Sequence, residues 1–144
     1  MADTIEKTIY QVLVAAAKAV VLPTGWDRVL PGVTYAPTAI SKFVSFELHF
    51  NKPIPTDSVS QELPPIRRGF VRANVMLPKA SALVDGIEVS GLVCAAFKIG
   101  TKFNRSGVQV RIDEHPEVGP TMTGATHHAT PVTIDFHQYP IVPA

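Results

Sequence analysis

The sequence has 144 residues, a length that suits one domain able to bury roughly two thirds of its unfolded surface. It is 46% hydrophobic and 17% charged, as in globular proteins, and its positive mean hydropathy indicates that partners cover some apolar surface. A net charge of +1 provides no long-range field to attract nucleic acid or a membrane. A single cysteine, Cys94, excludes an internal disulfide, fits a reducing compartment and is expected to be a small buried hydrophobe.

The first residues do not have the pattern of an export signal. Asp3 and Glu6 occupy positions where a signal peptide carries positive charge, and Lys18 interrupts the apolar run that follows. No stretch approaches the roughly eighteen uncharged apolar residues of a membrane span. We therefore expect neither export nor a membrane partner.

The first predicted element is a helix that ends near Val21. Asp3 is its expected N-cap, with Glu6 three residues later as in a capping box, and Pro23 and Gly25 end it. Its apolar side chains recur at helical spacing in two stripes, one of Ile5, Ile9, Val12, Ala16 and Val20, and one of Tyr10, Val14, Ala17 and Val21. Two stripes cannot both face one sheet, so we expect this helix to lie against two surfaces.

Residues 26–30 form a short candidate strand, and two long strands follow at residues 42–50 and 69–77. Each long run alternates, with one register uniformly apolar, which is the signature of a strand with one buried face. The apolar positions are Val44, Phe46, Leu48 and Phe50 in the first run and Val71, Ala73, Val75 and Leu77 in the second. These two strands are expected to form the centre of the molecule.

The second half predicts one more helix and two more strands. Residues 80–98 have helical spacing, are apolar nearly all round and are therefore expected to be buried, with Gly100 ending the helix. Residues 107–113 alternate as a strand, residues 116–124 are a predicted loop, and residues 128–139 are the last strand. The predicted fold class is α+β: an antiparallel sheet of about four main strands with two helices packed on one face, in a single domain over residues 1–144.

Residues 51–66 join the two central strands as a protruding loop. Its prolines fix φ and remove backbone donors, so it is not expected to extend the sheet, and connections of this length are uncommon unless functional or disordered. We interpret it as a partner-binding arm, with a surface loop of no role as the alternative. The residues assigned to the arm are Pro53, Pro55, Asp57, Glu62, Arg67 and Arg68.

No pattern of residues indicates catalysis, a cofactor or a metal. His127 and His128 are adjacent, so on a strand they point to opposite faces and cannot easily share one ion. The sequence lacks a nucleophile elbow, a phosphate-binding glycine loop and metal-ligand spacing. Arg67 and Arg68 are interpreted as ordinary solvated charges, with loose contact to a passing phosphate backbone as the alternative.

The order and spacing of these elements resemble the tail terminator proteins of long-tailed bacteriophages. The resemblance covers most of the chain. It rests on the first helix and on the following segments: Gly25-Trp26-Asp27-Arg28-Val29-Leu30-Pro31, Tyr35-Ala36-Pro37, Phe43 to Phe50, Arg67-Arg68-Gly69-Phe70-Val71, Leu77-Pro78, Phe97-Lys98-Ile99-Gly100, Gly107-Val108-Gln109-Val110-Arg111-Ile112, Val118-Gly119-Pro120 and Pro131-Val132-Thr133-Ile134. The chain departs from the family pattern at Lys79-Ala80 and in the length of the arm.

The resemblance implies a structural virion protein rather than an enzyme. Such proteins form a ring, commonly of about six copies, that caps the head-proximal end of the tail tube, stops tube growth and offers a surface to the head-completion connector. The implied partners are further copies of the chain, the tail tube protein, the connector protein and DNA that passes through the lumen without sequence-specific binding. The implied location is the virion tail, after assembly in the host cytoplasm.

The first helix supplies the expected ring contacts, because its second apolar stripe needs a neighbour. The expected subunit-interface residues are Ile9, Tyr10, Val12, Val14 and Ala17. The alternatives from the sequence are another phage neck or tail-completion protein and a small ligand-binding or enzymatic α+β domain with a pocket between the second helix and the sheet.

Overall fold

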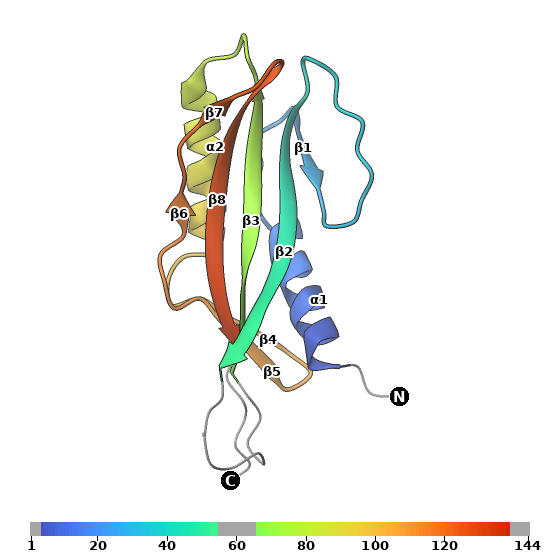
Figure 1. The fold of residues 1–144 in the computed structure, drawn as a ribbon, viewed down its shortest axis with the longest axis vertical. Helices are drawn as coiled ribbons and strands as arrows, with labels where there is room; N and C mark the ends of the chain where they lie inside the picture. The colour runs from blue at the N-terminus through green and yellow to red at the C-terminus, as the bar shows by residue number, and fades with distance from the viewer. Residues whose placement is uncertain (1–3, 55–65, 139–144) are drawn as a thin grey trace.

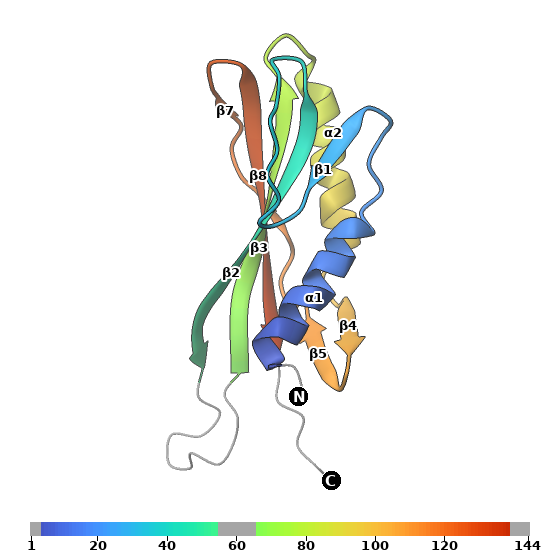
Figure 2. The same cartoon turned by 90° about the vertical axis from the view of Figure 1, so that its right-hand side faces the viewer.

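The computed structural model describes residues 4–54 and 66–138, which form two helices and one sheet of eight strands (Figure 1). In chain order the elements are α1 (Ile5–Lys18), β1 (Trp26–Val29), β2 (Lys42–Ile54), β3 (Ile66–Pro78), α2 (Leu83–Ala96), β4 (Lys102–Arg105), β5 (Val108–Arg111), β6 (Glu117–Val118), β7 (Met122–Thr123) and β8 (His127–Gln138). The long strands β2, β3 and β8 form the centre, and both helices lie on one side of it (Figure 2).

The sheet differs from the predicted antiparallel sheet of four main strands, and that prediction is wrong. Its order is β1-β2-β3-β8-β5-β4, with β6 and β7 also paired to β8. It is mixed, because β1 runs parallel to β2 with Trp26 opposite Lys42. The right-handed twist that accumulates over three strands of 12 or 13 residues curls the sheet into a half-barrel around the helices. The chain remains α+β overall.

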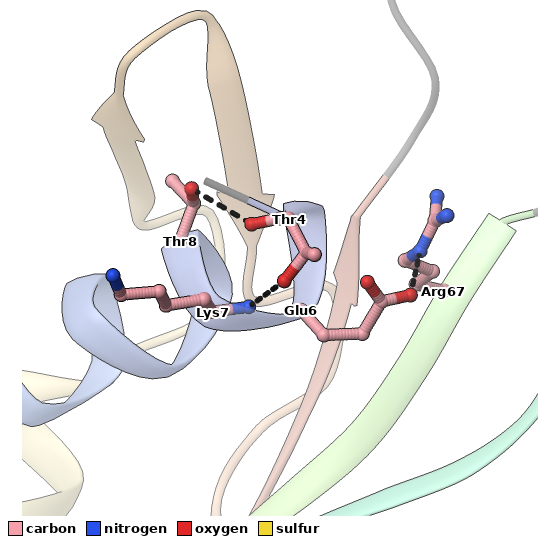
Figure 3. A network of polar contacts seen from close by, with 5 residues as sticks. All are labelled: Thr4, Glu6, Lys7, Thr8 and Arg67. Atoms are coloured by element: carbon pink, nitrogen blue, oxygen red, sulfur yellow. Dashed lines mark hydrogen bonds and ion pairs between the residues drawn. The ribbon is translucent and has the colours of Figure 1, made fainter. Parts of the chain in front are cut away.

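Helix α1 begins one residue later than the sequence predicted. Thr4 is the N-cap: its Oγ1 accepts the Lys7 backbone N–H at 3.2 Å, and its carbonyl accepts the Thr8 hydroxyl at 3.1 Å (Figure 3). Glu6, the expected partner in the capping box, accepts a hydrogen bond from Arg67 Nε on β3 at 2.8 Å. The predicted cap, Asp3, lies outside the described residues.

Strands β2 and β3 are confirmed and extend further than predicted. Asn51 pairs with Arg68, and Ile54 pairs with Ile66, so both ends of the expected loop belong to the sheet. The register shifts between Asn51 and Ile54, and this irregularity contains Pro53, which has no N–H to donate to a regular ladder. Residues 55–65 of the predicted loop lie outside the described residues.

Gly69 allows three strands to approach closely near this end of the sheet. It lies opposite Phe50 on β2 and opposite Phe136 on β8. A Cβ at this position would lie 2.1 Å from the His49 carbonyl oxygen and 2.9 Å from Cζ of Phe136. The rings of Phe50 and Phe136 meet edge to face across it with centroids 6.0 Å apart, so only glycine fits here.

Helix α2 is shorter than predicted and is not buried all round. Its inward face consists of Gly86, Val89, Ser90 and Val93, and the Ser90 hydroxyl donates to the Gly86 carbonyl at 2.8 Å. Its outer residues Leu83, Val84 and Ile87 are exposed, because no layer covers this side within the described part of the chain. The prediction that α2 is buried all round is therefore wrong, and the apolar residues on its outer side form an exposed surface.

Strands β4 and β5 form a hairpin where the sequence predicted one strand. Ser106 and Gly107 connect them with φ of 51° and 79°. Two successive residues with positive φ are the geometry of the tight hairpin turn whose twist matches that of the flanking strands. The short strands β6 and β7 also occupy what was predicted to be a loop at residues 116–124.

One hydrophobic core fills the space between the sheet and the helices. The largest fully buried side chains come from both helices, the three long strands and the residues next to these elements: Phe46, Phe97, Phe136, Ile9, Leu77, Ile112, Ile134, Val20, Val44, Val75, Val89 and Val93.

A buried polar contact lies where β2 begins. The His127 ring contacts the edge of Phe43, and its Nε2 donates to the Ser41 carbonyl at 2.8 Å.

Candidate interaction surfaces

The central sheet has a core face toward the helices and an open face away from them. Paired residues of neighbouring strands share a face, so the registers place Glu47 beside Arg72 and His49 beside Phe70 on the open face. There the His49 and Phe70 rings stack with centroids 4.7 Å apart, and Arg72 Cζ lies 5.0 Å from the Phe70 centroid. The open face is therefore polar and already well packed, as suits a surface rather than a second core.

The structure places the five predicted interface residues on different sides of α1. Ile9, Val12 and Ala17 are buried in the chain's own core, which leaves them little surface to offer a neighbour. Tyr10 is 38% exposed and its hydroxyl donates to the Pro31 carbonyl at 3.3 Å. Val14 lines a small apolar hollow against Phe46 and Leu48. A role for α1 in subunit contacts stays a prediction, and it now concerns Tyr10 and Val14.

The arginines at the root of the predicted arm make contacts within the chain's own fold. Arg67, whose side chain is 18% exposed, bonds Glu6 and so ties β3 to the first turn of α1 (Figure 3). Arg68 Nε donates to the Lys52 carbonyl at 3.0 Å across the irregular end of β2. Pro53 is exposed, and Pro55, Asp57 and Glu62 lie outside the described residues. The arm's binding role remains a prediction.

The histidines on strands β2 and β8 make separate local contacts. His127 is fixed by Ser41 and by Thr126 Oγ1 at 2.9 Å from its Nδ1, and His128 Nδ1 lies 3.0 Å from Thr123 Oγ1. His137 faces Asp113 at 3.8 Å. Within residues 4–54 and 66–138, no three His, Cys, Asp or Glu side chains gather closely enough to hold a metal ion. None of the helices in this part of the chain is long and apolar enough to cross a bilayer.

Among the described residues, three groups have displaced pKa values. The hydrogen bond from Arg67 holds the pKa of Glu6 below its usual range. The hydrogen bond from the Tyr35 hydroxyl to Asp27 Oδ2, 2.7 Å long, raises the pKa of Tyr35. Burial raises the pKa of the Cys94 thiol, so its thiolate is scarce at neutral pH. These displacements follow from a surface ion pair, an exposed hydrogen bond and partial burial, and none forms a catalytic arrangement.

The outer side of α2 exposes large apolar side chains. Leu83, Val84 and Ile87 are 50%, 66% and 65% exposed, and Asp85 and Glu88 beside them are also exposed. Large apolar side chains also lie exposed in other segments: Val21, Val33, Ile40, Val118 and Met122. Apolar clusters of this kind are typical of surfaces that become covered on assembly. The sequence indicated them through its positive mean hydropathy but could not locate them.

A second feature that sequence reasoning missed is the free edge of β2. β1 pairs with Lys42 to Ser45 only, so in the described residues β2 from Phe46 onward is paired on one side alone. A hollow runs along this edge, lined by Ser45 to His49 on one side and by the Val29 to Val33 segment on the other. At the other end of the sheet, β4 likewise pairs only with β5. Each edge leaves backbone hydrogen-bonding groups available.

Comparison with known proteins agrees with the resemblance seen in the sequence. The family model of the phage tail terminator protein matches residues 8–136, most of the chain. The chain therefore belongs to the phage tail terminator family, which gives it a structural role in the phage tail. A solved structure aligns with a TM-score of 0.71 and 19% sequence identity over 97% of this chain and 96% of that one, which supports the fold alone. No curated protein matches the chain significantly.

Proposed function

We propose that the chain forms a closed ring, of about six copies, at the head-proximal end of the tail tube. There it caps the tube, stops its polymerisation and provides the surface that joins the head connector. DNA passes through the lumen without sequence-specific contacts. The ring assembles in the host cytoplasm and becomes part of the virion tail. The observation that carries this proposal is the family match over residues 8–136.

The described surfaces suit such a ring. A ring built from one kind of chain needs two different complementary surfaces on each copy, because the contact is head to tail. The chain offers free strand edges at the two ends of one sheet and exposed apolar side chains on α2. The rigid core between them, with Phe46, Phe97 and Phe136 fully buried, keeps these surfaces at fixed positions.

Particle mass is the direct test. We expect analytical ultracentrifugation or native mass spectrometry to give a closed ring, alone or after addition of tube protein. Electron microscopy should then show a cap on tube ends, and tubes grown in its presence should stop elongating. A chain that stays monomeric and leaves tube ends growing would overturn the proposal.

Two alternatives give different results in the same experiments. Another phage neck or tail-completion protein of similar size would bind the connector and leave tube length unchanged. A ligand-binding or enzymatic domain would remain a monomer or dimer in the presence of tube. Genes for tube and tape-measure proteins beside this one would also favour the tail role.

A further inference from the structure

The two free edges of the sheet match one another. We propose that β4 of one copy lies beside the free edge of β2, residues 46–50, of the next copy, so that the sheet continues across the subunit boundary. The inference rests on the ring proposed above and identifies a contact that builds it. The occupant of the hollow beside β2 is therefore a second copy of this chain.

The end of β1 defines the stretch of the β2 edge beside which β4 would lie. β1 pairs with β2 as far as Val29 opposite Ser45, and the chain then leaves the sheet through Pro31. The next residues of β2, Phe46 to His49, line the hollow consecutively, as expected for a groove that follows a strand edge. An added strand would continue in line with β1, and the four residues of β4 fit this length.

The faces of the two strands also agree. On β2, Phe46 and Leu48 point to the core face, and Glu47 and His49 to the open face. On β4, Phe103 packs on the core side, 6.0 Å from the Phe97 ring. Lys102 pairs with Arg111, which pairs with His137 on the open face, so Lys102 shares that face. Joining the two edges therefore places apolar side chains beside one another on the core face and polar side chains beside one another on the open face.

Charge adds selectivity to this match. Glu47 is exposed, with its Oε2 3.3 Å from His49 Nε2, and its cross-strand neighbour Arg72 lies over the Phe70 ring. Lys102 is exposed on β4. A lysine on a short edge strand discourages indiscriminate pairing, whereas a carboxylate directly opposite makes the pairing favourable. We place Glu47 of one copy opposite Lys102 of the next.

Charge reversal tests the pairing in solution. Glu47→Lys and Lys102→Glu each put like charges opposite one another, and we expect each to raise the concentration needed for half-assembly by about tenfold. The combined variant restores the opposite charges in exchanged positions, and its assembly should return close to that of the unmodified chain. All variants should keep the thermal midpoint of the monomer, because both side chains are exposed.

Cross-linking gives an independent test with a matched control. In a Cys94→Ala background, Glu47→Cys combined with Lys102→Cys should form intersubunit disulfides, because Cα atoms of directly opposed residues lie about 4.5–5.5 Å apart. The ladder of products on a non-reducing gel should extend to the closed ring. The control combines Glu47→Cys with Arg105→Cys, an exposed position on the same strand but on the core-face register. It should cross-link far less.

The outcomes separate this contact from the ring itself. Normal rings with neutral charge reversals and no Glu47→Cys/Lys102→Cys product would overturn the strand pairing and leave the ring proposal standing. Cross-linking of both cysteine pairs to the same extent would also contradict it. A chain that forms no ring, alone or on tube ends, would overturn both.

Discussion

The two helices have the same length and pack on the same side of one sheet, but they are stabilised differently. Helix α1 has a capped start, a buried stripe around Ile9 and an ion pair to β3. Helix α2 has Ala82 at its N-cap position, without a side-chain cap, and exposes Leu83, Val84 and Ile87. The contrast shows that apolar content alone does not measure how firmly a helix is held by its own chain. In α1 the apolar stripe stabilises the fold, whereas the outer side of α2 contributes little to it.

Truncating one isoleucine on each helix should give the largest difference in stability between the two helices. Ile9→Ala removes a fully buried side chain from the core, so we expect it to lower the free energy of unfolding by about 2–5 kcal/mol. The matched variant Ile87→Ala removes a side chain that is 65% exposed and should cost less than about 0.5 kcal/mol. Urea denaturation of the monomer measures both. Equal losses would mean that α2's outer side is packed within the chain after all.

Removal of the cap of α1 should give the next largest effect. Thr4→Ala leaves the Lys7 N–H without its side-chain acceptor, at a cost of about 1 kcal/mol. Thr4→Ser keeps the hydroxyl and serves as the control, with a small loss. The thermal midpoint and the helical circular dichroism signal report the change. An unchanged midpoint in Thr4→Ala would show that water replaces the cap at no cost.

Addition of a cap to α2 should shift stability in the opposite direction. Ala82 already has the extended backbone of an N-cap, with φ of −70° and ψ of 131°. Ala82→Ser therefore adds an acceptor for the first-turn N–H groups and should stabilise the chain by about 0.5–1 kcal/mol. Ala82→Val, which adds bulk without an acceptor, is the control. If both variants behave alike, the start of α2 is limited by something other than its unsatisfied donors.

The ion pair between Glu6 and Arg67 should give the smallest effect, with a defined dependence on pH. Because the folded-state pKa of Glu6 is lowered, its stabilisation is present above its unfolded pKa and is lost as pH falls through the folded value. The Glu6 side chain is 54% exposed, so solvent screening limits the contribution to about 0.2–1 kcal/mol.

Glu6→Gln should therefore be less stable than the unmodified chain at pH ~7, and the difference should shrink as the pH falls below ~4. Urea midpoints across this range give the comparison, and Glu117→Gln, at an exposed position on β6, provides the control. A difference that stays constant with pH would rule out the ionised pair as its source.

Sequence patterns predicted the elements whose residues alternate strictly. Strands β2, β3 and β8 follow from runs such as Val71, Ala73 and Val75, because a single buried face imposes a period of two. Strand β4 was missed because only Phe103 among its four residues is apolar, although the Ser106-Gly107 turn after it is a hairpin signal. The parallel pairing of β1 has no local signature, since it depends on where the chain returns in space.

The candidate surfaces were harder to predict for a related reason. An apolar helix such as α2 has the same composition whether its outer side meets its own chain or another one, so burial was inferred where exposure is found. The free edge of β2 depends on β1 pairing only with Lys42 to Ser45, and no residue pattern marks that pairing. The family, in contrast, was recognised from the order and spacing of elements, and the family match confirms it.

The register shift between Asn51 and Ile54 has a consequence for how this protein can vary. Gly69, held between Phe50 and Phe136, admits no side chain and so fixes the alignment of the three central strands. The shift lies beyond this point, so residues added or lost between positions 54 and 66 need not move any core residue. Natural variation in length is therefore expected to concentrate there, and related chains can change this end of the molecule while keeping an identical interior.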